Sequence, residues 1–168
     1  MTRYEDAFEQ AKALKNATVG EPNALMREAL ADRIGDLLKE HNTAAIALEQ
    51  AKALKNATVG EPDARRCEAL ADRIRELLKP HNTPEIAFEQ AGALANAAIG
   101  EPGARHREAL ADRIGELLWR YNTAEIALMH AKALRNTAVV GPDLRRREAL
   151  ADRIGMLLRR YSIAESAL

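Results

Sequence analysis

The heptapeptide EALADRI occurs four times in the chain, at residues 28–34, 68–74, 108–114 and 148–154. Successive copies are 40 residues apart, so that aligning their flanking residues divides the chain without a gap into repeats 7–46, 47–86, 87–126 and 127–166. A fixed period of this length is typical of repeat proteins, in which each unit buries its apolar face against the next unit. We therefore expect residues 1–168 to form a single repeat domain.

The scarcity of aromatic residues limits how this domain can be packed. Aromatic residues make up 4% of the chain, against 47% hydrophobic and 30% charged residues. That balance is typical of a folded soluble domain rather than a disordered one. The interior must consist mainly of Ala, Leu, Ile and Val, which favours helices that pack closely together.

Each unit reads as two helices, of which the second unit gives the clearest example. A first helix is predicted over residues 62–79, because Leu70, Ile74 and Leu77 fall on one helical face. Pro80 ends this helix, since proline has no backbone N–H to continue it.

A second helix of the same unit is predicted from its caps. Thr83 has the side chain of an N-cap, and Pro84 suits the first helical position. Gly100 and Pro102 interrupt the chain before the next unit begins. The predicted fold class is all-α: an α-solenoid of four 40-residue helix-turn-helix repeats, with about eight helices and a truncated ninth.

The predicted helices at the two ends of the chain lack their partners. A helix over about 3–16 has no first-type helix before it, and the closing letters SIAESAL correspond to the first two turns of a second-type helix. Both end faces are therefore expected to lack the polar caps that repeat proteins usually carry.

The order EALADRIGELL, NTAEIALMHAKAL and VVGPD resembles a tetratricopeptide repeat of the long variety found in kinesin light chains and bacterial regulators. The resemblance rests on three features: a large-small pair in the first helix, a small residue that opens the second helix, and a Gly-Pro-type turn between units. These features are found at Ile34-Gly35, Ile114-Gly115 and Ile154-Gly155; at Ala47, Ala87 and Ala127; and at Gly20-Glu21-Pro22 and Gly141-Pro142. The resemblance implies a right-handed superhelix whose concave groove binds peptides or proteins, without catalysis.

The sequence departs from this family at several positions. Arg75 interrupts the large-small pair in the second unit, and Asn-Thr replaces the Gly-x-Tyr turn between helices. The aromatic residue of the family's first helix is replaced by Ala31, Ala71, Ala111 and Ala151. Another kind of helical-hairpin solenoid therefore stays open as an alternative.

A groove in the register of the family would be lined by polar residues of the first helices. They are Asp32, Asp36 and Lys39; Asp72, Glu76 and Lys79; Asp112, Glu116 and Trp119; and Asp152, Met156 and Arg159. One hypothesis is that the Asp row binds a basic or amide-rich peptide. The alternative is that each Asp bridges the Arg row (Arg33, Arg73, Arg113, Arg153) of a neighbouring unit, in exposed pairs of little energetic weight.

Apolar residues enter predicted polar positions almost only in the last two copies. Trp119 replaces a basic residue, while Met129 and Met156 replace acidic ones. Trp and Met are enriched at binding surfaces, so we expect a contact face here, with local repacking near the chain end as the alternative. The same region contains Arg145, Arg146, Arg147, Arg159 and Arg160.

Little in the sequence suggests chemistry. No phosphate-binding loop, dinucleotide fingerprint or paired metal-ligand motif occurs, so we expect no catalytic residue, no metal site and no cofactor. His41 and His81 occupy equivalent positions one unit apart, which is too far for a shared zinc ion. A dyad of Cys67 and His106 is conceivable but lacks a third orienting group.

The overall charge gives little reason to expect a nucleic-acid or membrane partner. The chain contains 25 basic and 25 acidic residues, although residues 127–168 have eight basic and four acidic side chains. A single cysteine and the absence of a long apolar segment favour a cytoplasmic protein.

The leading hypothesis for function is a non-catalytic scaffold that binds a peptide or protein through a helical groove or through the apolar and basic C-terminal face. The alternative is a self-assembling structural protein, a homodimer or a head-to-tail array that forms through its terminal helices.

Overall fold

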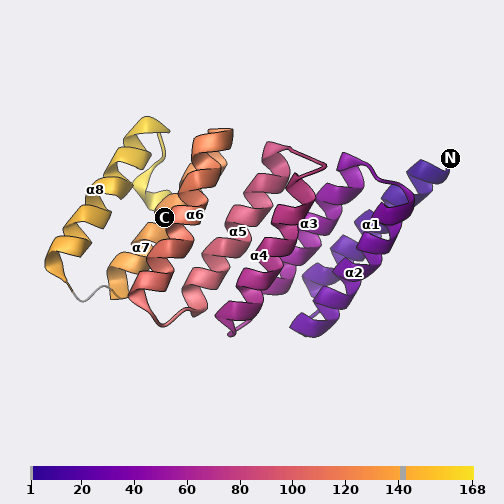
Figure 1. Ribbon diagram of the computed structural model, residues 1–168, viewed down its shortest axis with the longest axis horizontal. Helices are drawn as coiled ribbons and strands as arrows, with labels where there is room; N and C mark the ends of the chain where they lie inside the picture. The colour runs from indigo at the N-terminus through magenta and orange to yellow at the C-terminus, as the bar shows by residue number, and fades with distance from the viewer. Residues whose placement is uncertain (1, 141–142) are drawn as a thin grey trace.

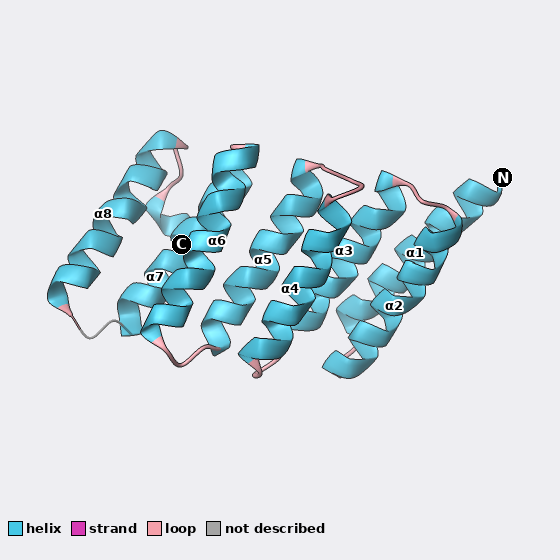
Figure 2. Ribbon diagram, viewed as in Figure 1, coloured by secondary structure: helices cyan, strands magenta, loops and turns pink. Residues whose placement is uncertain are grey.

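The computed structural model describes residues 2–140 and 143–168, and the chain within these ranges is all-α (Figure 1). Eight α-helices and one 3-10 turn are found there, and no strands (Figure 2). They are α1 (Arg3–Gly20), α2 (Ala24–Glu40), α3 (Ala44–Thr58), α4 (Ala64–Leu78), α5 (Pro84–Gly100), α6 (Ala104–Tyr121), α7 (Ala124–Val140), α8 (Leu144–Arg160) and the 3-10 turn η1 (Glu165–Ala167). The predicted turn at Gly141-Pro142 lies outside the described residues.

The helices stack in order along the long axis of the molecule, from α1 at one end to α8 at the other (Figure 1). The odd-numbered helices form one continuous layer, in which α1 packs on α3, α3 on α5 and α5 on α7. Each even-numbered helix packs on the odd-numbered helix before it, and α2, α4 and α6 also pack on the one after. The even-numbered helices thus form a second layer.

Local side-chain chemistry sets the starts of the second-type helices. The Oγ1 atoms of Thr43, Thr83 and Thr123 each accept a hydrogen bond from the backbone N–H three residues later, and Pro84 occupies the first turn of α5. The cap predicted at Thr83 and the helix end predicted near Gly100 are both confirmed.

The core consists of small and branched residues at positions that recur every 40 residues. Ala47, Ala87 and Ala127 are fully buried, as are the isoleucines of the EALADRI segment in the first three copies, Ile34, Ile74 and Ile114. Alanines on the odd-numbered helices permit the close approach that a continuous layer requires.

The ends of the chain differ from the prediction in detail. The first helix continues to Gly20 rather than stopping near residue 16, and SIAESAL forms only the 3-10 turn η1. A helix of one or two turns lacks enough backbone hydrogen bonds to be stable alone. Instead, the Arg135 guanidinium donates a hydrogen bond to the Leu168 carbonyl.

The N-terminal end face is more polar than expected. Asp6 is exposed at the position that Ile46, Ile86 and Ile126 fill with fully buried side chains in the later units. At the other end, Ala151 is exposed although its three counterparts in the earlier copies are fully buried.

Candidate functional site

A row of hollows follows the even-numbered helices, one hollow at each of three positions in the described part of the chain. Each is lined by a polar residue of an odd-numbered helix and by three residues of the next even-numbered helix. The four lining positions are equivalent in the first, third and fourth copies of the 40-residue repeat: Gln10, Arg33, Asp36 and Leu37; Gln90, Arg113, Glu116 and Leu117; and His130, Arg153, Met156 and Leu157. We call these the first, middle and last hollow.

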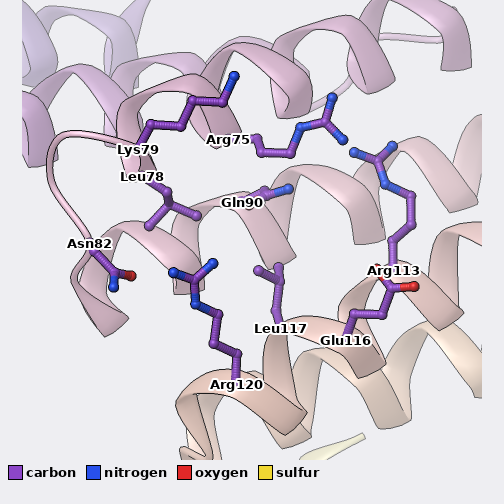
Figure 3. A pocket seen from close by; sticks show the side chains of 9 residues that line it. All are labelled: Arg75, Leu78, Lys79, Asn82, Gln90, Arg113, Glu116, Leu117 and Arg120. Atoms are coloured by element: carbon purple, nitrogen blue, oxygen red, sulfur yellow. The ribbon is translucent and has the colours of Figure 1, made fainter.

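The middle hollow is a cavity of about 420 Å³ between α4 and α6, with Gln90 of α5 at its base. Figure 3 shows Arg75 and Leu78 of α4 on one side, together with Lys79 directly after this helix, and the residues of α6 on the other. The predicted site residue Glu116 lies here. The walls present charged groups of both signs around the half-buried side chain of Leu117.

Ion pairs form a ladder between successive even-numbered helices. Arg73 Nη2 donates to Asp32 Oδ1 at 2.5 Å, Arg113 Nη2 to Asp72 Oδ1 at 2.6 Å, and Arg153 Nη2 to Asp112 Oδ1 at 3.0 Å. Arg113 also contacts Glu68, at 3.4 Å. The predicted site residues Asp72 and Asp112 are thus engaged within the stack, which is the arrangement named above as the alternative to a ligand-binding role.

Two charges of this ladder are unmatched, one in the first unit and one in the last. Asp152 of α8 and Arg33 of α2 have no ion-pair partner among the described residues, because each would need a further repeat unit beside it. Glu76 forms a local pair with Lys79, whose Nζ donates at 2.8 Å.

The last hollow differs chemically from the other two. Its volume is about 520 Å³, and Met156 replaces the acidic residue, so that Arg153, Arg159 and Arg160 lie around it without a carboxylate in its lining. In the first two units the residue equivalent to Arg159 is a lysine that pairs with the acid three positions before it, as in Lys39–Asp36 at 3.8 Å. Arg159 has no such partner in the described chain, and this hollow is therefore apolar and cationic.

His130 forms the base of the last hollow. Its side chain is buried, with 7% of the residue exposed, and neither ring nitrogen has a hydrogen-bond partner among the described residues. The pKa of His130 is lowered from 6.5 to about 4, chiefly by burial and to a smaller extent by the nearby Arg153, while Asp112 acts in the opposite direction. The imidazole is therefore neutral near pH 7 and offers one donor and one acceptor.

A glycine makes room for this histidine. A Cβ atom built on Gly115 of α6 would lie 2.9 Å from His130 Cε1, and one on Gly35 of α2 would lie 2.8 Å from Gln50 Nε2. The small residue of the predicted large-small pair thus accommodates the polar side chain of the next odd-numbered helix.

The structure separates the remaining residues of the predicted C-terminal face. Met156 and Arg159 line the last hollow. Trp119, which is 89% exposed, lines none of the three hollows and occupies the repeat position equivalent to Lys79. Met129 is half-buried against the core, and Arg146 bonds Glu108 near the opposite end of α8 from Arg159, next to Arg145. The last hollow therefore brings together only part of the predicted face.

Sequence reasoning placed Arg160 near the expected contact face but missed three other residues that line the last hollow: His130, Arg153 and Leu157. The signal for His130 was present, since it replaces Gln10, Gln50 and Gln90 in the other copies.

Cys67 and His106 do not form a dyad. The Cys67 thiol is buried and donates weakly to backbone carbonyls, and burial raises its pKa to about 11. His106 instead bonds Glu68, at 2.9 Å. Within the described residues, no group of three or more His, Cys, Asp or Glu side chains is arranged to hold a metal ion. No helix there is both long and apolar enough to cross a bilayer.

Comparisons of the chain with protein families, with curated proteins and with solved structures found no match. The site is therefore assigned from its own geometry.

Proposed function

We propose that this chain is a tetratricopeptide-like α-solenoid that binds an extended peptide segment of another protein along its row of hollows. The observation that carries this proposal is the repetition of one lining pattern in the first, middle and last hollows. A ligand with a regular backbone can place successive side chains into equivalent hollows, whereas a compact small molecule would need only one of them.

The lining chemistry supports a peptide ligand. Each hollow combines a half-buried leucine with a guanidinium group and a polar base, which suits a ligand that alternates apolar side chains with amide groups. Met156 adds exposed apolar area to the last hollow, and Trp119 adds exposed apolar area in the last turn of α6; such residues commonly dominate binding energy.

The proposal is tested with a displayed library of linear peptides selected on the intact chain. Binders should lose about tenfold in affinity for Glu116→Lys or Asp36→Lys, which reverse an exposed charge in the middle or first hollow. Ala69→Lys, at an exposed position of α4 outside the hollows, is the matched control. A library that yields no binder, or binders equally affected by all three variants, would overturn the proposal.

A further inference from the structure

A second site lies on the odd-numbered helices, where a repeated ion pair is incomplete. In α1 the Glu9 carboxylate lies 3.9 Å from Lys12 Nζ, and in α3 Glu49 lies 3.9 Å from Lys52 Nζ. In α5 the residue three positions after Glu89 is Gly92. Glu89 has therefore lost the lysine that its counterparts retain.

Glu89 is buried with only 7% of the residue exposed, and its Oε2 atom has no hydrogen-bond partner. Among the described residues, no Lys or Arg nitrogen lies within ion-pairing distance of it. Burial raises the pKa of this carboxyl, and the more distant Lys55 and Lys52 act in the opposite direction. A buried acceptor without a partner is costly, so a cation delivered to this atom would be stabilised strongly.

A cavity of about 420 Å³ gives access to Glu89 between α3, α5 and the start of α7. Leu48, Pro84 and Phe88 form its apolar walls, and Glu85 and Glu125 add two carboxylates that have no ion pair in the described chain. Lys52 and Thr123 also line the cavity, but Lys52 Nζ is paired with Glu49, at 3.9 Å, and not with Glu89. No residue lines both this cavity and the row of hollows. The carboxylates are not arranged to hold a metal ion.

We propose that this cavity binds a lysine side chain of a partner peptide, whose ammonium group lies beside Glu89. It would take the position that the Lys12 ammonium has beside Glu9 and the Lys52 ammonium has beside Glu49. Lysine fits because its compact ammonium sits on a flexible four-carbon stem, and that stem can lie along Leu48 and Phe88. This site does not depend on the function proposed for the hollows.

The test is an NMR titration of the intact, ¹⁵N-labelled chain with a blocked peptide that carries one lysine between two leucines. We expect saturable shifts of the Phe88, Glu89 and Gly92 amide signals below about 10 mM peptide, and at least tenfold weaker binding of the acetyl-lysine peptide. An arginine peptide reports whether any cation suffices; equal or tighter binding of arginine would overturn the assignment to lysine.

Two variants test the role of Glu89 itself. Gly92→Lys restores the lysine of the other units; its Cβ would approach only the flexible side chain of Lys55, with Cγ at 3.3 Å and Cδ at 3.6 Å. Gly92→Lys and Glu89→Gln should each weaken binding at least tenfold, while Glu148→Gln, at an exposed position of α8 outside this cavity and outside the hollows, should leave it unchanged. Absence of saturable shifts, equal binding of the acetylated peptide, or full affinity in Gly92→Lys would overturn the proposal.

Discussion

Trp119 and Met156 are apolar at positions where the other units have charged residues. The residues of those units are therefore suitable replacements for both. Trp119→Lys and Met156→Glu restore residues that occupy the equivalent places in other copies, and both side chains are exposed. We expect the pair of changes to weaken peptides selected on the native chain by about tenfold, because exposed Trp and Met provide apolar contact area. Affinity is measured by calorimetry.

Two readouts keep that prediction specific. Circular dichroism should show unchanged helicity, since neither side chain contributes to the core. Val139→Lys, which also removes an exposed apolar residue, but from α7, should bind as the native chain does. Unchanged affinity in the Trp119 and Met156 variant would remove the last hollow from the binding site.

His130 should make stability depend on pH. The pKa of His130 is about 4 in the folded chain and 6.5 in the unfolded chain, so the unfolded chain takes up the proton first as the pH falls. The free energy of unfolding should then decrease between pH 6.5 and about 4, by up to roughly 3 kcal/mol.

His130→Gln, the residue of the other units, should remove this part of the pH dependence. Urea unfolding of both proteins at several pH values provides the comparison. Parallel stability curves across this pH range would show that His130 is not held neutral by burial.

At the scale of the helix, two glycines at equivalent positions should respond oppositely to the same change. Gly115→Ala places a methyl group 2.9 Å from the buried His130 ring and should destabilise the chain by about 1–3 kcal/mol. Gly155→Ala meets only the tip of the Arg159 side chain, at 3.3 Å, and should stabilise α8 by about 0.5–1 kcal/mol. Thermal unfolding distinguishes the two, and equal effects would mean that α6 does not approach His130 this closely.

The ladder between even-numbered helices makes a second prediction at this scale. Arg113 contacts both Glu68 and Asp72 of α4, so Arg113→Ala should destabilise the stack by about 1 kcal/mol. Arg33→Ala removes the equivalent side chain of α2, which has no ion-pair partner in the described chain, and should change the stability little. Chemical denaturation in low salt measures both; a loss for Arg33→Ala as large as that for Arg113→Ala would argue against the ladder.

Helix starts and the all-α fold class could be predicted because their causes lie within a few residues. Thr83 and Pro84 define the start of α5 through their own side chains, whatever packs on that helix. The base of each hollow could not be predicted in this way. His130 meets Arg153 and Met156 only when α7 and α8 pack together, and the sequence marks this solely as a departure from the glutamines of other units.

At the scale of the whole molecule, self-assembly through the end faces stays a prediction. The residues at those faces disfavour it. Asp6 and Ser166 stand where interior units bury isoleucine, so docking one end on another would bury polar groups. We expect a monomer at micromolar concentration and association in an Asp6→Ile variant. Light scattering coupled to size exclusion measures both, and a native chain whose mass rises with concentration would favour assembly.

The central claim is that 40-residue units stack by one repeated operation and so present the same hollow again and again. The most direct measurement is an experimental structure of the chain at atomic resolution, from which residues 24–58, 64–98 and 104–138 are superimposed pairwise. We predict that one rotation and one translation relate each unit to the next, with Gln50, Gln90 and His130 at equivalent places facing the following even-numbered helix. Units related by different operations, or a His130 side chain that points away from α8, would contradict the account.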